Sequence, residues 1–276
     1  MTEILKNLID SRFATDQEIG RERLPTPMQS LLLGHRSRRR FKPDPISDET
    51  MTTLLACALS APAKSDLQQV SIIRFTDPTK REAIMDLMPG MPWMKETPEF
   101  LLFCGDGRRV RRVCELRGTD FAHDPLDAFV NAAADAAIVM QTFIIAAEAE
   151  GLGCCPISGV REVNDEIVAI AELPDEVFPF AGLCVGVPAD DPWISVRLPM
   201  SLTVHENSYD DSAFEEEVRD YDARRAAVNP HKRQRGVDKW GEASDYGWST
   251  DKARQTASKD RLSFCRYILN HGYPIK

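Results

Sequence analysis

The sequence predicts an α+β fold, and three observations lead to that prediction. Apolar-periodic segments typical of helices interleave with short β-branched or aromatic runs typical of buried strands. The two kinds of segment do not alternate strictly, as they would in a parallel doubly wound sheet. No G-x-G-x-x-G sequence opens a helix after a strand, so a Rossmann dinucleotide domain is not expected.

The first helices follow from local capping signals. Residues 1–33 are a polar lead-in with a weakly amphipathic helix that ends at Gly34, because glycine is common at helix C-termini. Ser47 is placed to cap the start of a second helix, which has acidic residues in its first turn and ends near Pro62.

The middle of the chain predicts strands and one long helix. SIIRF (71–75) and EFLLFCGD (99–106) suit buried strands, and VFPFAGLCVGVP (177–188) reads as a central strand with apolar residues on both faces. Residues 126–153 are alanine-rich and apolar nearly all round, which predicts a buried helix at the core or at a subunit interface. Residues 161–173 predict another helix.

The character of the chain changes at about residue 206. The following segment is charged and short of aliphatic residues, so it is expected to cross a surface rather than to join the core. A helix is expected around residues 260–272 at the end of the chain. No internal repeat is present, which excludes solenoids and propellers.

Composition narrows the class of protein. The 276 residues (31.0 kDa) are 43% hydrophobic and carry a formal net charge of −9 with a pI near 5.2. This acidity argues against a general nucleic-acid binder, which needs a basic face. Seven cysteines lie mostly in apolar runs without disulfide-framework spacing. With no leader and no uncharged stretch approaching the roughly 18 residues that span a bilayer, we expect a cytoplasmic protein without membrane association.

A basic run near the start of the chain, GHRSRRRF at residues 34–41, contrasts with this acidity. In extended backbone its residues His35, Ser37 and Arg39 share one side and can converge on one anion. Arginine, serine and histidine all donate hydrogen bonds to phosphate oxygens. The run therefore predicts a phosphate site, with a solvated basic cluster as the alternative.

A second basic feature is Arg197, which stands alone in the apolar, proline-bounded stretch VRLPMSLTVHENSY (196–209). An isolated arginine in such surroundings needs a partner. The partner is either a ligand anion or, in a structural salt bridge, Asp190 or Asp191.

Two polar segments lie between these basic features. SAPAKSDLQQ (60–69) joins a helix to a strand and carries Lys64, Ser65 and Gln68, which can hydrogen-bond a sugar-like chain or a ring edge. GLGCCPISGVR (151–161) is expected to be a glycine-punctuated loop whose backbone N–H groups can face a flat ligand. The alternatives are a plain helix-to-strand turn and a plain helix stop.

Several catalytic and metal-binding patterns are missing from the sequence. The five histidines are scattered without metal-ligand spacing, so no metal is expected. Neither a nucleophile elbow nor a P-loop occurs. Adjacent Cys154 and Cys155 are expected to be packing cysteines rather than a redox pair. Phosphate-binding features without proton-transfer groups indicate that a bound cofactor performs the chemistry.

Several motifs follow one another in a fixed order: HRSRRRF at 35–41, L-Q-x-x-S-I-I-R at 67–74, and GLG followed by I-x-G-x-R at 151–161. G-L-C-x-G-x-P, R-L-P and VHENSY come after them. In these motifs the sequence resembles the FMN-dependent nitroreductase and flavin reductase family, especially its NADPH-preferring, oxygen-insensitive nitroreductase branch. The resemblance covers residues 34–209 and continues more loosely to the C-terminus.

The resemblance implies a three-layer α-β-α sandwich with a mostly antiparallel central sheet, built as an intertwined homodimer with FMN at the subunit interface. It divides the chain into an N-terminal helical extension (1–33), an FMN-binding core (34–205) and a C-terminal extension that wraps the partner subunit (206–276). The implied ligands of the FMN phosphate, ribityl chain and ring are His35, Arg36, Ser37, Arg39, Lys64, Ser65, Gln68, Pro156, Ile157, Ser158, Gly159 and Arg197.

The chain departs from the branch at a few positions, which bear on flavin tuning and substrate choice. Where the branch has a run of serines, this chain has Pro62, Ala63 and Lys64. Ser195 stands in place of a lysine, Met91 in place of a glutamine, and Ser158 in place of one glycine of the loop's pair.

The resemblance implies a ping-pong reaction without a catalytic side chain. NAD(P)H passes hydride to flavin N5, and a nitroaromatic, a quinone or a similar flat acceptor then takes the electrons. Lys232, Arg233 and Arg235 in HKRQRG (231–236) are expected to select NADPH, with a solvated basic loop as the alternative.

Two other functions stay open at this point. One is a specialised reductase acting as a dehalogenase, a free-flavin reductase or an enone reductase, with Lys64, Met91 and Trp93 as the altered positions. The other is a non-catalytic module that binds FMN or another phosphorylated ligand.

Overall fold

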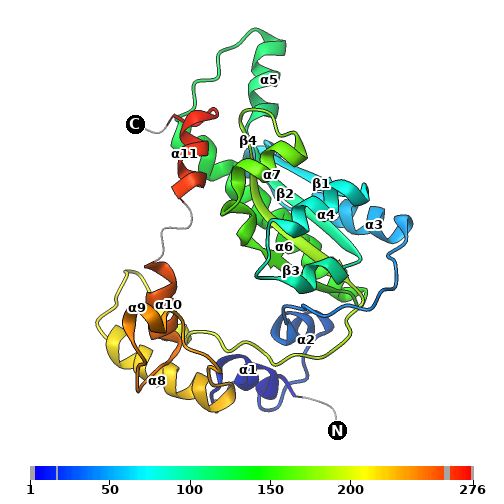
Figure 1. The fold of residues 1–276 in the computed structure, drawn as a ribbon. Coiled ribbons are helices and arrows are strands. Elements are labelled where there is room, and N and C mark those ends of the chain that lie inside the picture. The colour runs from blue at the N-terminus through cyan, green and yellow to red at the C-terminus, as the bar shows by residue number, and fades with distance from the viewer. Residues whose placement is uncertain (1–3, 17, 258–261, 275–276) are drawn as a thin grey trace. The chain divides into compact units, whose positions relative to one another are not determined.

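The fold is known from a computed structural model that describes residues 4–16, 18–257 and 262–274 (Figure 1). Its strands are β1 (Val70–Arg74), β2 (Glu99–Asp106), β3 (Gly153–Ile157) and β4 (Val177–Gly186). Its helices are α1 (Leu5–Phe13), α2 (Pro27–Gly34), α3 (Asp48–Leu59), α4 (Pro78–Asp86), α5 (Arg108–Arg117), α6 (Pro125–Ala149), α7 (Asn164–Ala171), α8 (Phe214–Val228), α9 (Val237–Trp240), α10 (Trp248–Thr256) and α11 (Leu262–Asn270). Short 3-10 turns cover Lys64–Asp66, Pro92–Glu96, Ser158–Arg161 and Met200–Leu202.

The chain forms two compact units. The first contains residues 1–36 and 193–259, and the second contains residues 37–192 and 260–276. Each unit therefore combines segments that are distant in sequence. Residues 193–205, which the sequence-based division assigned to the core, cluster with the first unit.

The second unit is built on a four-stranded sheet in the order β1-β2-β4-β3. All three neighbouring strand pairs are antiparallel, as the predicted sandwich requires. The expected strands at 71–75, 99–106 and 177–188 are confirmed as β1, β2 and β4. Their long apolar runs predicted these strands, because a sheet covered on both faces needs apolar residues on both faces of each strand.

Helices cover both faces of this sheet (Figure 1). Leu101 and Phe103 of β2 pack into a core with α3 and α6, while Phe100 and Leu102 of the same strand pack into a second core with α4 and α7. All four side chains are fully buried. The alternation of side chains along β2 thus joins two helical layers through one sheet and confirms the three-layer α-β-α sandwich.

The helix α6 is the long buried helix that the alanine-rich segment predicts. Within the described residues it is the one helix long and apolar enough to cross a membrane by length and composition, a candidate that our sequence analysis did not find. Ala132, Ala136 and Phe143 are 0% exposed, and they pack against the sheet and the neighbouring aromatic cluster. The apolar composition of α6 therefore belongs to the core of a folded unit.

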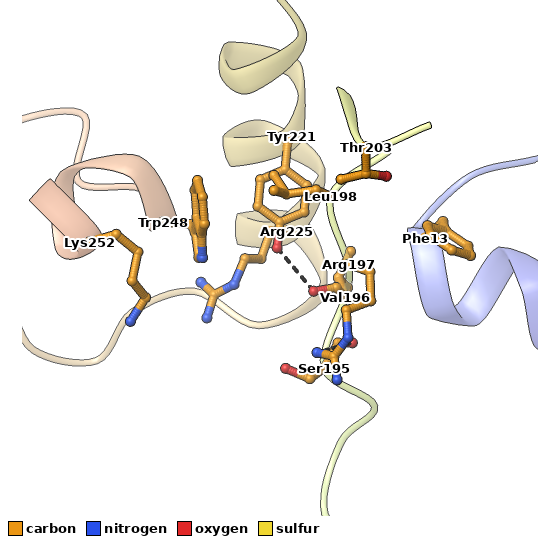
Figure 2. Close-up of a pocket in the computed structure, with 10 residues that line it drawn as sticks. All are labelled: Phe13, Ser195, Val196, Arg197, Leu198, Thr203, Tyr221, Arg225, Trp248 and Lys252. Atoms are coloured by element: carbon orange, nitrogen blue, oxygen red, sulfur yellow. Dashed lines mark hydrogen bonds between the residues drawn. The ribbon is translucent and has the colours of Figure 1, made fainter. Parts of the chain in front are cut away.

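The charged segment after residue 206 is more ordered than the sequence indicated, because it contains the helix α8. Three glutamates lie in the first turn of α8 and Arg225 lies in its last turn, which suits the helix dipole. Tyr221 is the buried anchor of α8, with 2% of its surface exposed, and its hydroxyl donates to the carbonyl of Val196 at 2.9 Å (Figure 2). The charged composition of the segment gave no prediction of this helix, whose buried residue is Tyr221.

Candidate functional site

The basic run begins where α2 ends. Thr26 caps the start of α2 and forms a capping box with Gln29, the helix ends at Gly34, and irregular backbone follows. His35 and Arg36 belong to the first unit, whereas Ser37 and the residues after it belong to the second. His35, Arg36 and Ser37 are half-buried, and Arg39 is exposed.

In the second unit the basic run lies along β3 and the chain that follows β4. The backbone N–H of Arg38 donates to the carbonyl of Cys154 at 2.9 Å. The Arg38 guanidinium pairs with Asp191 at 2.8 Å and donates to the carbonyl of Asp190. Arg38 is therefore a structural residue. On Cys155, burial raises the thiol pKa, while the positive charge of nearby Arg39 acts in the opposite direction.

The two aspartates that were the alternative partners of Arg197 pair with other arginines. Asp191 lies 2.8 Å from Arg38, and Asp190 lies 3.6 Å from Arg40. The exposed Arg197 side chain donates to the carbonyl of Ser195 at a long 3.5 Å. These contacts leave the guanidinium of Arg197 accessible to an anion.

A residue that sequence analysis missed, Arg12 of α1, connects the segments that carry His35 and Arg197. Arg12 is buried, with 5% of its surface exposed. Its guanidinium donates to the carbonyl of Leu33 at 2.7 and 3.1 Å and to that of His35 at 2.5 Å. It also donates to the carbonyl of Ser195 at 2.9 Å. In return, the N–H of Arg197 donates to the carbonyl of Arg12 at 2.9 Å. Arg12 thus brings together two predicted phosphate-binding segments within the first unit.

The polar segment between α3 and β1 is a strained loop held by a buried carboxylate. Ser65, Asp66 and Gln68 all have positive φ angles, of 50°, 59° and 52°. Asp135 of α6 is 1% exposed and accepts hydrogen bonds from the backbone N–H groups that flank the loop, at 3.1 Å from Lys64 and 2.8 Å from the residue after Gln68. The side chains of Lys64, Ser65 and Gln68 are left exposed. Asp135 gave no sequence signal because its partners lie 71 and 66 residues away in the chain.

The segment 151–161 is not the loop that its glycines predicted. Gly153–Ile157 forms β3, which pairs with β4, and a 3-10 turn at Ser158–Arg161 follows. Pro156 and Ser158 are exposed, while Ile157 is 2% exposed and anchors the turn in the core. A Cβ atom placed on Gly159 would lie 3.3 Å from the terminal carbon of Met91.

Met91 lies beside the 3-10 turn at Ser158–Arg161, close to Gly159. Met91 and Trp93 are partly buried against the core cluster that contains Ile157 and Val160. Met91 is thus the apolar residue placed next to the turn that is predicted to face the flavin.

All three residues of the predicted nucleotide-selecting cluster are exposed, and one of them has partners in the first unit. Lys232 and Arg233 are exposed. Arg235 lies 3.5 Å from Asp251, and its backbone N–H donates to the hydroxyl of Tyr246 at 2.9 Å. Arg235 is thus tied into the structure of the first unit.

The buried cysteines are poor candidates for thiol chemistry. Burial raises the pKa of the thiols of Cys104, Cys154 and Cys184, which keeps them protonated. Adjacent Cys154 and Cys155 are free and buried, as expected of packing cysteines. Among the described residues, no group of three or more histidine, cysteine, aspartate or glutamate side chains could hold a metal ion.

Comparison with known proteins identifies the family. The model of the nitroreductase family matches residues 32–187, and the model of the nitroreductase family C-terminal domain matches residues 195–276. The chain therefore belongs to the nitroreductase family.

Relatives and solved structures agree with this assignment. The chain is 39% identical over 184 residues to an oxygen-insensitive NADPH nitroreductase of Salmonella typhimurium, covering 67% of this chain and 75% of the relative. It is 35% identical over 215 residues to a Cr(VI) reductase of a Pseudomonas species, covering 77% and 88%. The structure of nitroreductase A from Vibrio parahaemolyticus superposes with a TM-score of 0.78 at 29% identity, covering 90% of this chain and 98% of that one.

Replacing Arg12 tests its connecting role. We expect Arg12→Ala to lower the free energy of unfolding of the first unit by at least about 2 kcal/mol, because buried carbonyls lose charged donors. Arg12→Lys restores part of the loss, since an ammonium cannot reach all three carbonyls. The control Arg21→Ala removes an exposed ion pair with Glu18 and changes stability by less than about 0.5 kcal/mol. Equal urea unfolding curves for Arg12→Ala and the control would contradict the role.

Asp251 predicts a pH dependence of stability. Burial alone would raise its pKa, but hydrogen bonds from Lys252 and Tyr246 and the charges of Lys252 and Arg235 lower the pKa to about 2. Because the folded-state pKa lies below the unfolded one, the contribution is present above about pH 4 and lost as the pH falls toward 2. We expect Asp251→Asn to cost roughly 2 kcal/mol at pH 7. The gap between variant and wild type should close near pH 2; a gap independent of pH in acid titrations would refute this.

Proposed function

We infer that this chain is an FMN-dependent NAD(P)H oxidoreductase that reduces nitroaromatics, quinones or similar flat acceptors. The observation that carries the inference is the connection, through Arg12, of the His35 segment with the Arg197 segment, because these are the two ends of the expected phosphate site. The names of the Salmonella nitroreductase and the Pseudomonas Cr(VI) reductase support a broad range of acceptors.

The residues present fit FMN. A phosphate dianion calls for several charge-assisted donors. The first unit offers the exposed guanidinium of Arg197, and the second unit offers Arg39 and the hydroxyl of Ser37. Left-handed backbone at Ser65 and Gln68 is typical of ligand clamps, where strain is maintained by surrounding contacts. These features support a ligand with a phosphate at one end and a flat polar ring at the other.

When bound, FMN supplies the transfer of hydride between NAD(P)H and the acceptor. The protein's own residues bind and orient. His35, Ser37 and Arg39 would hold the phosphate, Ser65 and Gln68 would bind the ribityl chain and ring edge, and the backbone of 156–159 would bind the ring. Met91 and Trp93 supply apolar surface that excludes water. No side chain is required to act as a general acid or base, because solvent can protonate the product.

We also propose that the chain works in the cytoplasm as a homodimer, with residues 206–276 wrapping the partner. Support comes from α6, on which Leu126, Val130 and Ile138 are 48%, 52% and 38% exposed at spacings of four and eight residues. Such an apolar stripe on a helix surface is typical of a subunit interface.

The absorption spectrum tests the proposed activity. We expect purified protein reconstituted with FMN to be yellow, and to bleach when NADPH or NADH is added without oxygen. Nitroaromatics should then restore the colour. Poor nitroaromatic turnover with rapid turnover of a halogenated, enone or free-flavin acceptor would indicate the specialised reductase. FMN binding without bleaching would indicate the non-catalytic module, and no FMN binding at all would refute the proposal.

The dimer has a separate test. Light scattering during size-exclusion chromatography should give twice the chain mass of 31.0 kDa. Ile138→Glu places a charge on the exposed stripe of α6 and should shift the protein toward monomer, whereas Glu150→Gln at the end of the same helix should not. A monomeric wild type at micromolar concentration would contradict the proposal.

A further inference from the structure

One peptide group of the loop before β1 is held from two sides by side chains of opposite charge. The group joins Gln68 to Gln69. Its N–H donates to the buried carboxylate of Asp135 in α6 at 2.8 Å, and its carbonyl accepts from the guanidinium of Arg109 in α5. A carboxylate can only accept and a guanidinium can only donate. A flipped peptide group would therefore lose both bonds, so the two side chains together fix its orientation.

A network of hydrogen bonds holds the Arg109 guanidinium in this place. The guanidinium also donates to the carbonyl of Val70 at 3.0 Å, to the hydroxyl of Ser71 at 2.9 Å and to the carboxylate of Asp106 at 3.0 Å. Asp106, with 7% of its surface exposed, accepts in addition from the Ser71 hydroxyl at 2.5 Å and from the backbone N–H of Arg109 at 3.1 Å. Arg109 is thus fixed through both its backbone and its side chain.

The network connects the loop to the central sheet. Asp106 is the last residue of β2, and Arg109 is the second residue of α5. The backbone N–H of Asp106 also donates to the carbonyl of Gln69 at 3.0 Å. The carbonyls of Gln68, Gln69 and Val70 are therefore all bonded from the end of β2 and the start of α5, while the N–H groups of the loop are bonded from α6.

These contacts lie next to a residue with strained backbone. Gln68 has a φ angle of 52°, which a residue other than glycine keeps only where the surrounding contacts enforce it. The Nε2 of Gln68 donates to the carboxylate of Asp66 at 2.9 Å. Both the backbone and the side-chain amide of Gln68 are consequently oriented without a ligand.

We propose that Arg109 is a positioning residue, which together with Asp135 fixes the Gln68–Gln69 peptide group and thereby sets where Gln68 meets the flavin edge. Arg109 acts through the carbonyl of Gln68 and not by contact with the flavin. The proposal rests on the proposed function, in which Gln68 binds the ring edge. Without Arg109 the peptide group is free to rotate, and FMN binding must then supply the cost of ordering the loop.

The experiment compares Arg109→Gln and Arg109→Lys in the full chain, alone and combined with Gln68→Ala. Arg112→Gln is the matched control, because Arg112 lies exposed three residues further along the same helix. The first measurement is the dissociation constant of the apoprotein for FMN. The second is hydrogen–deuterium exchange of the backbone amides of residues 64–70 in the apoprotein, which reports the order of the loop without any flavin.

We expect Arg109→Gln to weaken FMN binding about tenfold, as for the loss of one charged hydrogen bond. Arg109→Lys should recover part of this loss, since an ammonium can bond one carbonyl but cannot span all four partners. In the Gln68→Ala background, Arg109→Gln should change FMN binding by less than about twofold, because the side chain that it positions is gone. The loop amides should exchange faster in Arg109→Gln than in the wild type or in Arg112→Gln.

Two results would overturn the proposal. One is an Arg109→Gln variant with the FMN affinity and the loop exchange of Arg112→Gln. The other is a tenfold loss that persists in the Gln68→Ala background, which indicates a general structural role instead of an effect through Gln68. A wild type that binds no FMN would refute the proposed function, and the exchange measurement then decides whether Arg109 orders the loop. If Arg109→Gln does not fold, Arg109→Lys carries both measurements with a smaller expected loss.

Discussion

The hydrogen bonds of the buried Arg12 guanidinium hold together the segments of the first unit that contain His35 and Arg197. A buried charge is costly unless its donors are satisfied, and here the carbonyls of Leu33, His35 and Ser195 satisfy them. Those carbonyls are consequently fixed around one point. The helix α1 precedes the matched family region, which begins at residue 32, and through Arg12 it positions the basic segments of the first unit.

The sheet of the second unit explains which elements could be predicted from sequence. The strands β2 and β4 lie in its interior and are covered on both faces, so they need the continuous apolar runs that made them visible. The strand β3 was taken for a loop because it contains Gly153 and Pro156. It pairs with β4 alone, and proline is tolerated on such an edge strand. Glycine is needed at 153 because a Cβ there would meet the side chain of Arg38.

Some residues of the candidate site could be predicted from local sequence, and others depend on contacts between distant parts of the chain. His35, Ser37 and Arg39 could be proposed from sequence because the basic run that contains them is contiguous. Arg12 and Asp135 could not, since each acts on a segment distant in the chain: Arg12 on 195–197, and Asp135 on the loop after α3. The patterns in a single sequence predict periodicity and helix caps. They do not predict which buried polar side chain will hydrogen-bond to which distant backbone group.

Asp135 shows why such a residue matters for binding. Left-handed backbone costs about 1 kcal/mol or more for each non-glycine residue, and Ser65, Asp66 and Gln68 all adopt it. The carboxylate of Asp135 bonds the N–H groups that flank these residues, so hydrogen bonds from a rigid helix offset the strain before any ligand arrives. A loop ordered in advance loses little entropy on binding. The backbone that carries the exposed side chains of Ser65 and Gln68 is therefore held in one conformation. Such a loop suits a ligand with an edge of fixed shape better than a range of ligands with different shapes.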